Sequence, residues 1–495
     1  MGTAVNIADD KDRIGAFRMV GNLYFVGTYK ASSHLIDTGD GLILLDTGYA
    51  ETADVILESM DKLGFDIRDV KYIIHSHGHR DHTGGTAKLV ALSGAKTFIH
   101  EADLRYLSND PALSFVPDVF VRDGDIIRLG NTEILCLETP GHTAGTLSFF
   151  FDLEEKGRVY RAGTFGGAGT NQLKKPFLWD RGLSLLLRGQ FLESIERLKK
   201  EHVDVFIGNH SWQNDTRGNY EKSLTCEENP FIDDTRWRAF LEKSEQKMLR
   251  IMREESRTQF INYAHRGASE YAPENTLLSF NLGVFMGANG IETDVHLTKD
   301  GVPVLFHDDT LKRVTGEEGS IEDYTYEELR KFRVVKGELA DRIVKLEDFL
   351  EHMSFRDMLF AIELKAEGTA QPVADLVRAY HLEKKVVITS FKYEELCRMC
   401  EYAPELRKGY LAKTVTEELL ADMRVRGIDE ICPIAKSVTA EQVEQWHRQG
   451  FNVRAWGVKD EELMKQVYDA GADGMTVNFP DKLAAYICQC EASAE

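Results

Sequence analysis

Short apolar segments alternate with helical segments throughout the second half of the chain, and this rhythm constrains the fold more than any other feature. Eight of them have the length and composition of a strand: INYAH, GIETDVHL, MLFAIELK, KVVITSF, GYLAK, DEICPIA, FNVRAWGV and GMTVNF. Eight parallel strands separated by helices are what a (β/α)8 barrel requires, and that fold places catalytic groups at the C-terminal ends of its strands. We therefore predict a TIM barrel from Ile261 onward.

One further apolar run follows the second of these strands. VPVLFH (302–307) comes after only the turn TKDG, which is too short for a helical crossover between parallel strands. We expect this run to return as an antiparallel hairpin over the barrel mouth. The polar stretch from Asp308 to about Val344 has no regular pattern, and we expect an irregular insertion there.

The first half of the chain mixes β-rich runs such as NLYFVGTY and GLILLDTGY with helical patterns such as ETADVILESMDKLG. This mixture predicts an α/β sandwich. A helical pattern without Gly or Pro, DDTRWRAFLEKSEQKMLRIMREES, precedes the barrel. Since 495 residues exceed one ordinary hydrophobic core, we predict two α/β domains, 1–256 and 257–495.

Charge and hydropathy exclude some partners. The chain has 60 Lys and Arg against 81 Asp and Glu, a net charge of −21, which would repel a nucleic acid backbone. The chain contains no apolar stretch of about 18 residues or more, so we expect no integral membrane segment. The acidic start MGTAVNIADDKDRIG differs from a secretory signal and favours a cytoplasmic location.

The seven cysteines of the chain include a single CxxC, and we expect them to be reduced thiols. The sequence does not indicate the oligomeric state.

Histidines cluster in the first half. HSHGHRDHTGG follows the apolar run VKYII, so His77, His79, Asp81 and His82 are expected in a loop beyond a strand end. Two Gly-flanked loops carry the further histidines His142 and His210. Imidazole and carboxylate ligands suit zinc, with an open position for a water of lowered pKa. Any one of these histidines alone could be a surface residue, but their density favours a metal site.

Residues 14–256 resemble the metallo-β-lactamase superfamily, since LIDTGDGLILLDTG, HSHGHRDHTGG, ETPGHTAGT and GNH occur in the family's order. The loop RAGTFGGAG has Gly163 and Thr164 where many members have a metal-bridging Asp, and ENPFIDD matches the lactamase subclass that lacks this bridge. The resemblance implies an αββα sandwich with two Zn²⁺ ions and a hydroxide nucleophile between them. Its implied ligands are His77, His79 and His142 for one zinc, and Asp81, His82 and His210 for the other, with Asp81 also counted as catalytic.

Two residues near this cluster are expected to act indirectly. Asp46, in LLDTG, resembles the family's Asp that supports the metal loop from behind. His75 precedes His77 by two residues and is expected to pack at the strand end.

A second set of polar residues ends the barrel strands. His265 and Arg266 follow the first strand, and Glu292 and Asp294, two apart in the next, share one face. His307 ends the hairpin run, and AIELK supplies Glu363 and Lys365. Carboxylates can hold Mg²⁺ or Ca²⁺, cations can bind phosphate and histidines can move protons, which together suit phosphoryl transfer. The alternative is a buried salt-bridge network.

Residues 259–487 resemble the glycerophosphodiester phosphodiesterase family, through HRGASEYAPENT, GIETDVHLTKDGVPVLFHDDTLKRVTG, AIELK and DGMTVNFP. The resemblance implies hydrolysis to glycerol 3-phosphate and an alcohol. Its implied roles are acid and base for His265 and His307, ligands of one Mg²⁺ or Ca²⁺ for Glu292, Asp294 and Glu363, and substrate binding and transition-state stabilisation for Arg266 and Lys365.

Three further positions of the barrel concern the substrate mouth and the departures from the family pattern. Trp456 could line the substrate mouth or belong to the core. Asn478 and Lys459 depart from the family's usual Asp and Asn, and we expect both to lie outside the catalytic core.

The combined patterns predict a bifunctional hydrolase of small-molecule phosphodiesters and of ester or lactam-type substrates. Two alternatives remain open at this point. The N-terminal domain could be a true β-lactamase, or one domain could be a regulatory or binding module. Complete ligand sets in both halves argue against the latter.

Overall fold

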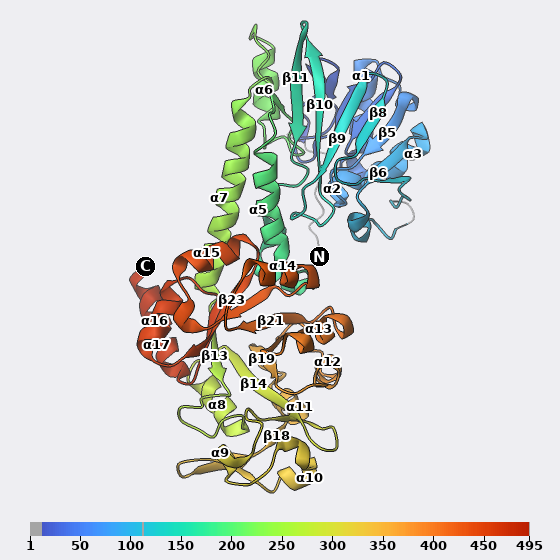
Figure 1. The fold of residues 1–495 in the computed structure, drawn as a ribbon. Helices are drawn as coiled ribbons and strands as arrows, with labels where there is room; N and C mark the ends of the chain where they lie inside the picture. The colour runs from blue at the N-terminus through green and yellow to red at the C-terminus, as the bar shows by residue number, and fades with distance from the viewer. Residues whose placement is uncertain (1–11, 111–112, 495) are drawn as a thin grey trace. The chain divides into compact units, whose positions relative to one another are not determined.

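The computed structural model describes residues 12–110 and 113–494, and the chain divides into two compact units (Figure 1). The first unit comprises Met1–Leu173 and Gln190–Met248, and the second Lys174–Gly189 and Leu249–Glu495. Within the described ranges, no helix is long and apolar enough to cross a membrane.

The first unit is built on two β-sheets. The seven-stranded sheet has the order β1 (Phe17–Val20), β2 (Leu23–Phe25), β3 (His34–Asp37), β4 (Leu42–Leu45), β5 (Val70–Ile74), β6 (Lys96–Ile99) and β7 (Val119–Phe120). The five-stranded sheet has the order β12 (Val205–Phe206), β11 (Arg158–Thr164), β10 (Leu147–Glu155), β9 (Thr132–Glu138) and β8 (Ile126–Leu129). The helices begun in this unit are α1 (Ala53–Leu63), α2 (Arg80–Thr83), α3 (Thr86–Ser93), α6 (Thr216–Ser223) and α7 (Thr235–Thr258).

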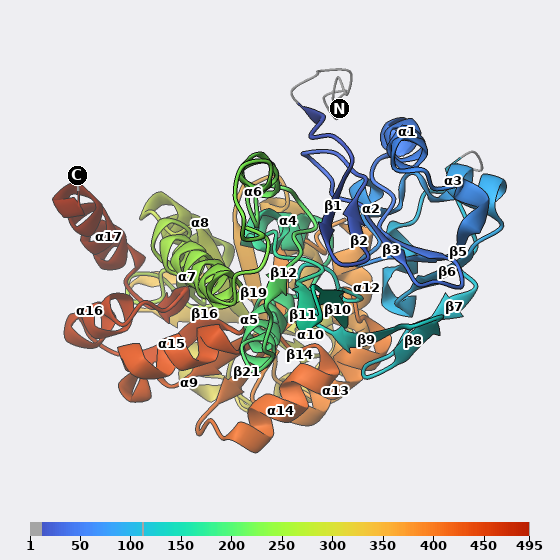
Figure 2. The same cartoon turned by 90° about the horizontal axis from the view of Figure 1, so that it is seen from above.

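Alternating side chains of the strands supply two separate cores. Ile43 and Leu45 of β4 point between the two sheets, whereas Leu42 and Leu44 pack with Ile56 of α1 on the outer face. Figure 2 shows the ribbons of α1 and α3 on the side of the seven-stranded sheet that faces away from β8 and β9. On the other sheet, Phe150 of β10 faces outward to Trp237 of α7, with ring centroids 6.0 Å apart. Each sheet is thus covered by helices, and the predicted αββα sandwich is confirmed.

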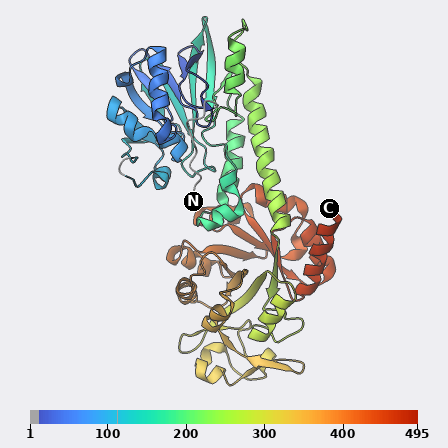
Figure 3. The same ribbon diagram turned by 180° about the vertical axis from the view of Figure 1, so that it is seen from behind.

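The second unit contains a closed barrel of eight parallel strands (Figure 3). They are β13 (Ile261–His265), β14 (Gly290–Leu297), β19 (Leu359–Leu364), β20 (Val386–Ser390), β21 (Arg407–Ala412), β22 (Glu430–Pro433), β23 (Asn452–Val458) and β24 (Gly474–Val477). The surrounding helices are α8 (Leu277–Phe285), α11 (Leu346–Met353), α12 (Ala370–Ala379), α13 (Tyr393–Tyr402), α14 (Glu417–Arg426), α15 (Ala440–Arg448), α16 (Glu461–Asp469) and α17 (Pro480–Ala494). Pairing of β13 with β14 and β24 closes the barrel, and the predicted TIM barrel is confirmed.

The run VPVLFH forms β15 (Pro303–Leu305), which pairs antiparallel with β14 as expected. The following stretch is not irregular, so that expectation was wrong. It forms the elements α9 (Lys312–Thr315), α10 (Tyr326–Leu329), β16 (Arg333–Lys336), β17 (Leu339–Arg342) and β18 (Val344–Lys345). A small core that includes Leu311, Ile321 and Leu329 holds them together. These apolar residues are widely spaced in a polar stretch and follow neither the period of a strand nor that of a helix. Their spacing therefore does not predict these elements.

A short segment from the middle of the first half belongs to the barrel unit. Residues 174–189 include α4 (Lys175–Asp180) and the start of α5 (Leu186–Leu198). Lys175, 3% exposed, forms an ion pair with Asp473. The Arg407 guanidinium lies over the Trp179 ring, 3.9 Å from its centroid. A buried polar network therefore attaches this segment to the barrel.

Candidate metal centres

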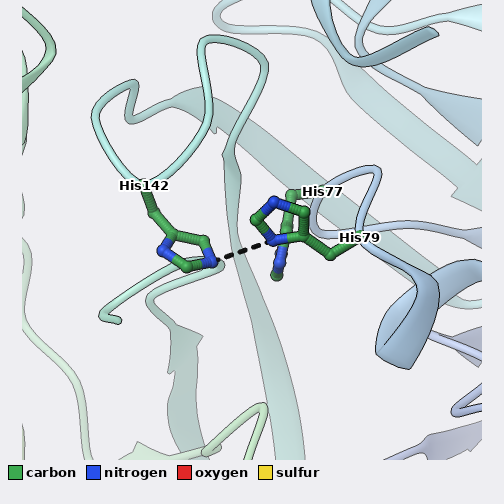
Figure 4. A group of neighbouring side chains, drawn as sticks. All are labelled: His77, His79 and His142. Atoms are coloured by element: carbon green, nitrogen blue, oxygen red, sulfur yellow. Dashed lines mark hydrogen bonds between the residues drawn. The ribbon is translucent and has the colours of Figure 1, made fainter. Parts of the chain in front are cut away.

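Three histidines of the first unit converge on one point. His77 and His79 lie between β5 and α2, and His142 lies between β9 and β10. Their ligand nitrogens lie within 4.8 Å of one another, and His79 Nδ1 is 3.1 Å from His142 Nε2 (Figure 4). Nitrogen lone pairs at this separation favour a shared cation, so the group fits the zinc predicted there.

A second group adjoins the first. His77, Asp81 and His82 also offer ligand atoms within 4.8 Å of one another. His210 Nε2 is 3.9 Å from Asp81 Oδ2, and His82 Nε2 is 3.4 Å from the same oxygen. His82 Nε2 is buried and has no hydrogen-bond partner within the described chain. The structure thus brings together all six predicted ligands, with His77 close to both groups.

Second nitrogens of the imidazoles are fixed by the surrounding protein. His82 Nδ1 lies 2.8 Å from Asp46 Oδ2, and His142 Nδ1 lies 2.8 Å from the Gly169 carbonyl. His210 Nδ1 lies 2.5 Å from the Lys30 carbonyl. These contacts direct each Nε2 into the site, as outer partners of metal-bound histidines do.

Asp46 holds the loop from behind, in the place expected from the sequence. Its carboxylate accepts hydrogen bonds from the Ser76 amide and hydroxyl, both at 2.7 Å. Its φ of 57° is unusual for a residue with a side chain, and such backbone strain concentrates at functional sites. His75 is fully buried and contacts Thr86 at 3.2 Å, consistent with packing at the strand end.

Burial sets the protonation of this site. It lowers the pKa of His79 to about 3 and the pKa values of His142 and His210 to about 4, so these imidazoles are neutral near pH 7. His82 differs: burial would lower its pKa, but Asp81 and Asp46 outweigh it and raise the pKa to about 10. A metal ligated by His82 must displace that proton, so zinc binding should release a proton.

Gly163, expected in a loop where many superfamily members have the bridging Asp, lies instead in β11 and leaves no room for a side chain. A Cβ atom there would lie 2.5 Å from the Val203 side chain and 3.0 Å from the Phe150 ring. Close packing of the second sheet therefore explains this departure from the superfamily's commoner pattern.

Sequence reasoning missed Asp103, a fully buried carboxylate behind both histidine loops. It accepts hydrogen bonds from the Gly78 amide at 2.7 Å and from the Thr143 hydroxyl and the Gly145 amide at 2.8 Å. Asp103 therefore ties the His77–His79 loop to the His142 loop. A single Asp after the strand TFI gives no sequence signal for such a role.

We expect Asp103→Ala to weaken zinc binding about 10- to 100-fold, because it frees both ligand loops without removing a ligand. Competition with a zinc chelator measures this. The matched variant Asp110→Ala changes an exposed carboxylate and should leave affinity unchanged. Equal zinc affinity of Asp103→Ala and the unaltered protein would contradict the positioning role.

Three buried carboxylates meet in the barrel. Glu292, Asp294 and Glu363 come from the neighbouring strands β14 and β19, where Asp294 is in register with Glu363. Their oxygens lie within 4.8 Å of one another. Burial, together with Asp294, raises the pKa of Glu292 well above its usual range and the pKa of Glu363 to about 7. Such mutual repulsion fits a site for a hard divalent cation.

Two cationic side chains border these carboxylates. Arg266 Nε is 3.2 Å from Asp294 Oδ2, and Lys365 Nζ is 2.9 Å from Glu363 Oε1. The Arg266 backbone adopts a φ of 55°, which lets its amide donate to Glu292 Oε2 at 3.1 Å. The structure therefore places both predicted phosphate-binding residues beside the carboxylate cluster.

The two barrel histidines lie at the edge of this cluster, where His307 acts electrostatically on Asp294, and each has 31% of its side chain exposed. His265 Nε2 is 3.9 Å from Glu292 Oε2, and His307 Nδ1 contacts Asp308 at 2.6 Å. Sequence reasoning missed Asp308 and the Arg313 side chain that binds it. Exposed imidazoles next to a metal site can exchange protons with a bound substrate.

Asn478 was expected to lie outside the catalytic core, and that expectation was wrong. Its Oδ1 lies 2.6 Å from His265 Nδ1 and accepts a hydrogen bond from Ser269 at 3.0 Å. The contact arises because β13 and β24 are neighbours in the closed barrel although they are over 200 residues apart in sequence.

We expect Asn478→Ala to lower kcat of the barrel reaction about tenfold, since it leaves His265 without its orienting partner. KM should change less than kcat. Steady-state kinetics on glycerophosphocholine measure both values, with Asn281→Ala, an α8 residue, as control. A kcat equal to that of the unaltered protein would exclude the orienting role.

Other predicted positions lie near the barrel mouth. Trp456 is half-buried in β23 and makes an edge contact with Phe391, with ring centroids 4.8 Å apart. Its role in substrate binding stays a prediction. His296 is buried, with Nε2 3.4 Å from the His307 carbonyl.

Comparison with known proteins agrees with both halves. Residues 265–482 match the glycerophosphoryl diester phosphodiesterase family model, and residues 26–196 match the metallo-β-lactamase superfamily model. A glycerophosphodiester phosphodiesterase of Caldanaerobacter subterraneus is 33% identical over 230 residues, 44% of this chain and 94% of the relative. An uncharacterized protein of Bacillus subtilis is 34% identical, over 46% of this chain and 97% of the relative. The FEZ-1 metallo-β-lactamase from Legionella gormanii is 27% identical, with a TM-score of 0.45, over 49% of this chain and 97% of that one.

Proposed function

Because the chain belongs to the glycerophosphodiester phosphodiesterase family and carries a metallo-β-lactamase superfamily domain before the barrel, we propose that it is a bifunctional metal-dependent hydrolase. The barrel would hydrolyse glycerophosphodiesters to glycerol 3-phosphate and an alcohol. The N-terminal unit would hydrolyse a different small molecule at a di-zinc site. The convergence of three buried carboxylates, two cations and two histidines on one barrel end carries the first proposal.

In the barrel, Glu292, Asp294 and Glu363 would hold one Mg²⁺ or Ca²⁺ ion, whose charge would stabilise the phosphoryl oxygens when bound. Arg266 and Lys365 would bind the remaining phosphate oxygens. One of His265 and His307 would accept the proton of a glycerol hydroxyl as its oxygen forms a bond to phosphorus. The other would donate a proton to the departing alcohol, leaving a cyclic phosphate that water then opens.

In the N-terminal unit, His77, His79 and His142 would hold one zinc, and Asp81, His82 and His210 the second. When bound, the pair of ions would lower the pKa of a water to supply a nucleophile near neutral pH. Asp46 and Asp103 would keep the ligand loops in place through their hydrogen bonds. The substrate class includes esters, thioesters, lactones and β-lactams, and the fold alone does not select among them.

An assay of the full chain tests both activities. We expect release of glycerol 3-phosphate from glycerophosphocholine, dependent on Mg²⁺ or Ca²⁺, and zinc-dependent hydrolysis in a panel of nitrocefin, lactones, thioesters and p-nitrophenyl acetate. Asp81→Ala or His142→Ala should remove the second activity by emptying one zinc position. Full N-terminal activity in both variants would contradict the two-zinc mechanism.

A further inference from the structure

A cavity of about 590 Å³ lies in the first unit beside His210. Residues 168–171 and Trp212 form one wall, and one face of α7 forms the other. The carbonyl of Gly169, in the first wall, contacts His142 Nδ1 at 2.8 Å. The cavity therefore adjoins residues of both predicted zinc positions and has the volume of a site for a small molecule.

One wall of the cavity is cationic. Arg236, Lys243 and Lys247 recur at helical spacing on the cavity-lining face of α7. Arg236 is paired with Asp233 at 2.9 Å, whereas neither lysine forms an ion pair with any residue in the ranges that the structure describes. Asp215 also lines the cavity, but its carboxylate accepts a hydrogen bond from the Gly218 amide at the start of α6. Two lysines without partners thus face this space, although the whole chain carries a charge of −21.

The rest of the lining provides apolar surface. The Trp212 ring stacks on His210 with centroids 4.4 Å apart and an interplanar angle of 10°. Trp212 is 52% exposed, so its free face is available to a ligand, and Phe240 contributes on the opposite wall. An aromatic surface beside a metal ligand favours a planar or apolar group next to the reacting bond.

We propose that this cavity is the substrate site of the N-terminal centre and selects substrates that carry an anionic group, such as a carboxylate, next to an apolar or aromatic portion. Lys243 and Lys247 bind the anionic group, and Trp212 contacts the apolar portion. This assignment rests on the proposed hydrolase function, because it takes the zinc centre as the place where the bond is broken. It narrows the open substrate class to anionic molecules.

Binding of two matched amides tests the selection apart from catalysis. Succinanilic acid carries a carboxylate that acetanilide lacks, and both share the anilide ring. Calorimetric titration of the zinc-loaded full chain should give about tenfold tighter binding of the acid at low salt, and high salt should reduce the difference. Lys243→Gln combined with Lys247→Gln should abolish the preference, whereas Lys200→Gln combined with Lys222→Gln, at exposed lysines outside the cavity, should retain it.

Equal binding of the two amides, no binding of either, or an unchanged preference in the Lys243 and Lys247 variant would overturn the inference. Zinc-dependent hydrolysis of a panel that includes the neutral p-nitrophenyl acetate and the anionic nitrocefin, measured in parallel, reports on the proposed function instead. Hydrolysis without charge selection would refute only the substrate class. Charge selection without any hydrolysis would refute the hydrolase function.

Discussion

The 495-residue chain with His307→Ala is expected to lose glycerophosphodiester hydrolysis by about 10²- to 10⁴-fold, the usual contribution of a general acid or base. His307 lies beside the carboxylate cluster and keeps 31% of its side chain exposed, so it can reach a substrate at the barrel mouth. Release of glycerol 3-phosphate from glycerophosphocholine measures the loss. Zinc-dependent hydrolysis by the N-terminal unit should be unchanged.

The matched control is His352→Ala, which changes a histidine of α11 that is hydrogen-bonded to Asn281 and is not among the predicted catalytic or metal-binding residues. It should retain most of the phosphodiesterase activity. The reciprocal variant His79→Ala should remove N-terminal activity and spare the barrel. If His307→Ala kept full activity, His307 would be neither acid nor base.

Lys175→Ala is expected to lower the unfolding free energy of the barrel unit by about 3 to 5 kcal/mol, because it leaves a buried charge on Asp473 without its cationic partner. Chemical denaturation followed by circular dichroism measures the change. The matched control is Lys384→Ala, since Lys384 pairs with Asp180 at 3.6 Å in an exposed position. That pair should contribute about 0 to 1 kcal/mol. Equal effects of the two substitutions would contradict the importance of the buried pair.

The same network predicts a direction for pH dependence. Burial would raise the pKa of Asp473, but His447 and Lys175 outweigh it and hold the pKa below its usual range. The contribution of Asp473 to stability is therefore present above the pKa of an unfolded Asp and is lost as the pH falls below it. A fragment starting near Thr258 lacks Lys175 and Arg188, so we expect it to be less stable than the barrel in the full chain.

Strand positions and site residues were predictable where the pattern that indicates them lies within one short segment of the sequence. The eight barrel strands follow from apolar segments of regular spacing. The HSHGHRDH segment predicts a metal site because four potential ligands occur within six residues. Glu292 and Asp294 were predictable as a pair because residues two apart in a strand share a face. These patterns need no knowledge of distant contacts.

Contacts between distant segments were not predictable from the pattern. Asp103 ties two histidine loops together, yet in the sequence it is one acidic residue among 81. Asn478 reaches His265 only because the barrel closes, and Lys175 reaches Asp473 across nearly 300 residues. Such partners depend on tertiary packing, which a periodicity argument does not contain.

The most direct test of two separate metal centres is elemental analysis of the full chain purified without chelator. We expect about two zinc ions per chain, because imidazole ligands select zinc, and one exchangeable Mg²⁺ or Ca²⁺, because the barrel cluster offers only oxygen ligands. His79→Ala should lower the zinc content and leave the Mg²⁺ or Ca²⁺ content and the phosphodiesterase activity intact. If the chain retained no transition metal after purification, and bound none on reconstitution, the account of the N-terminal unit would be contradicted.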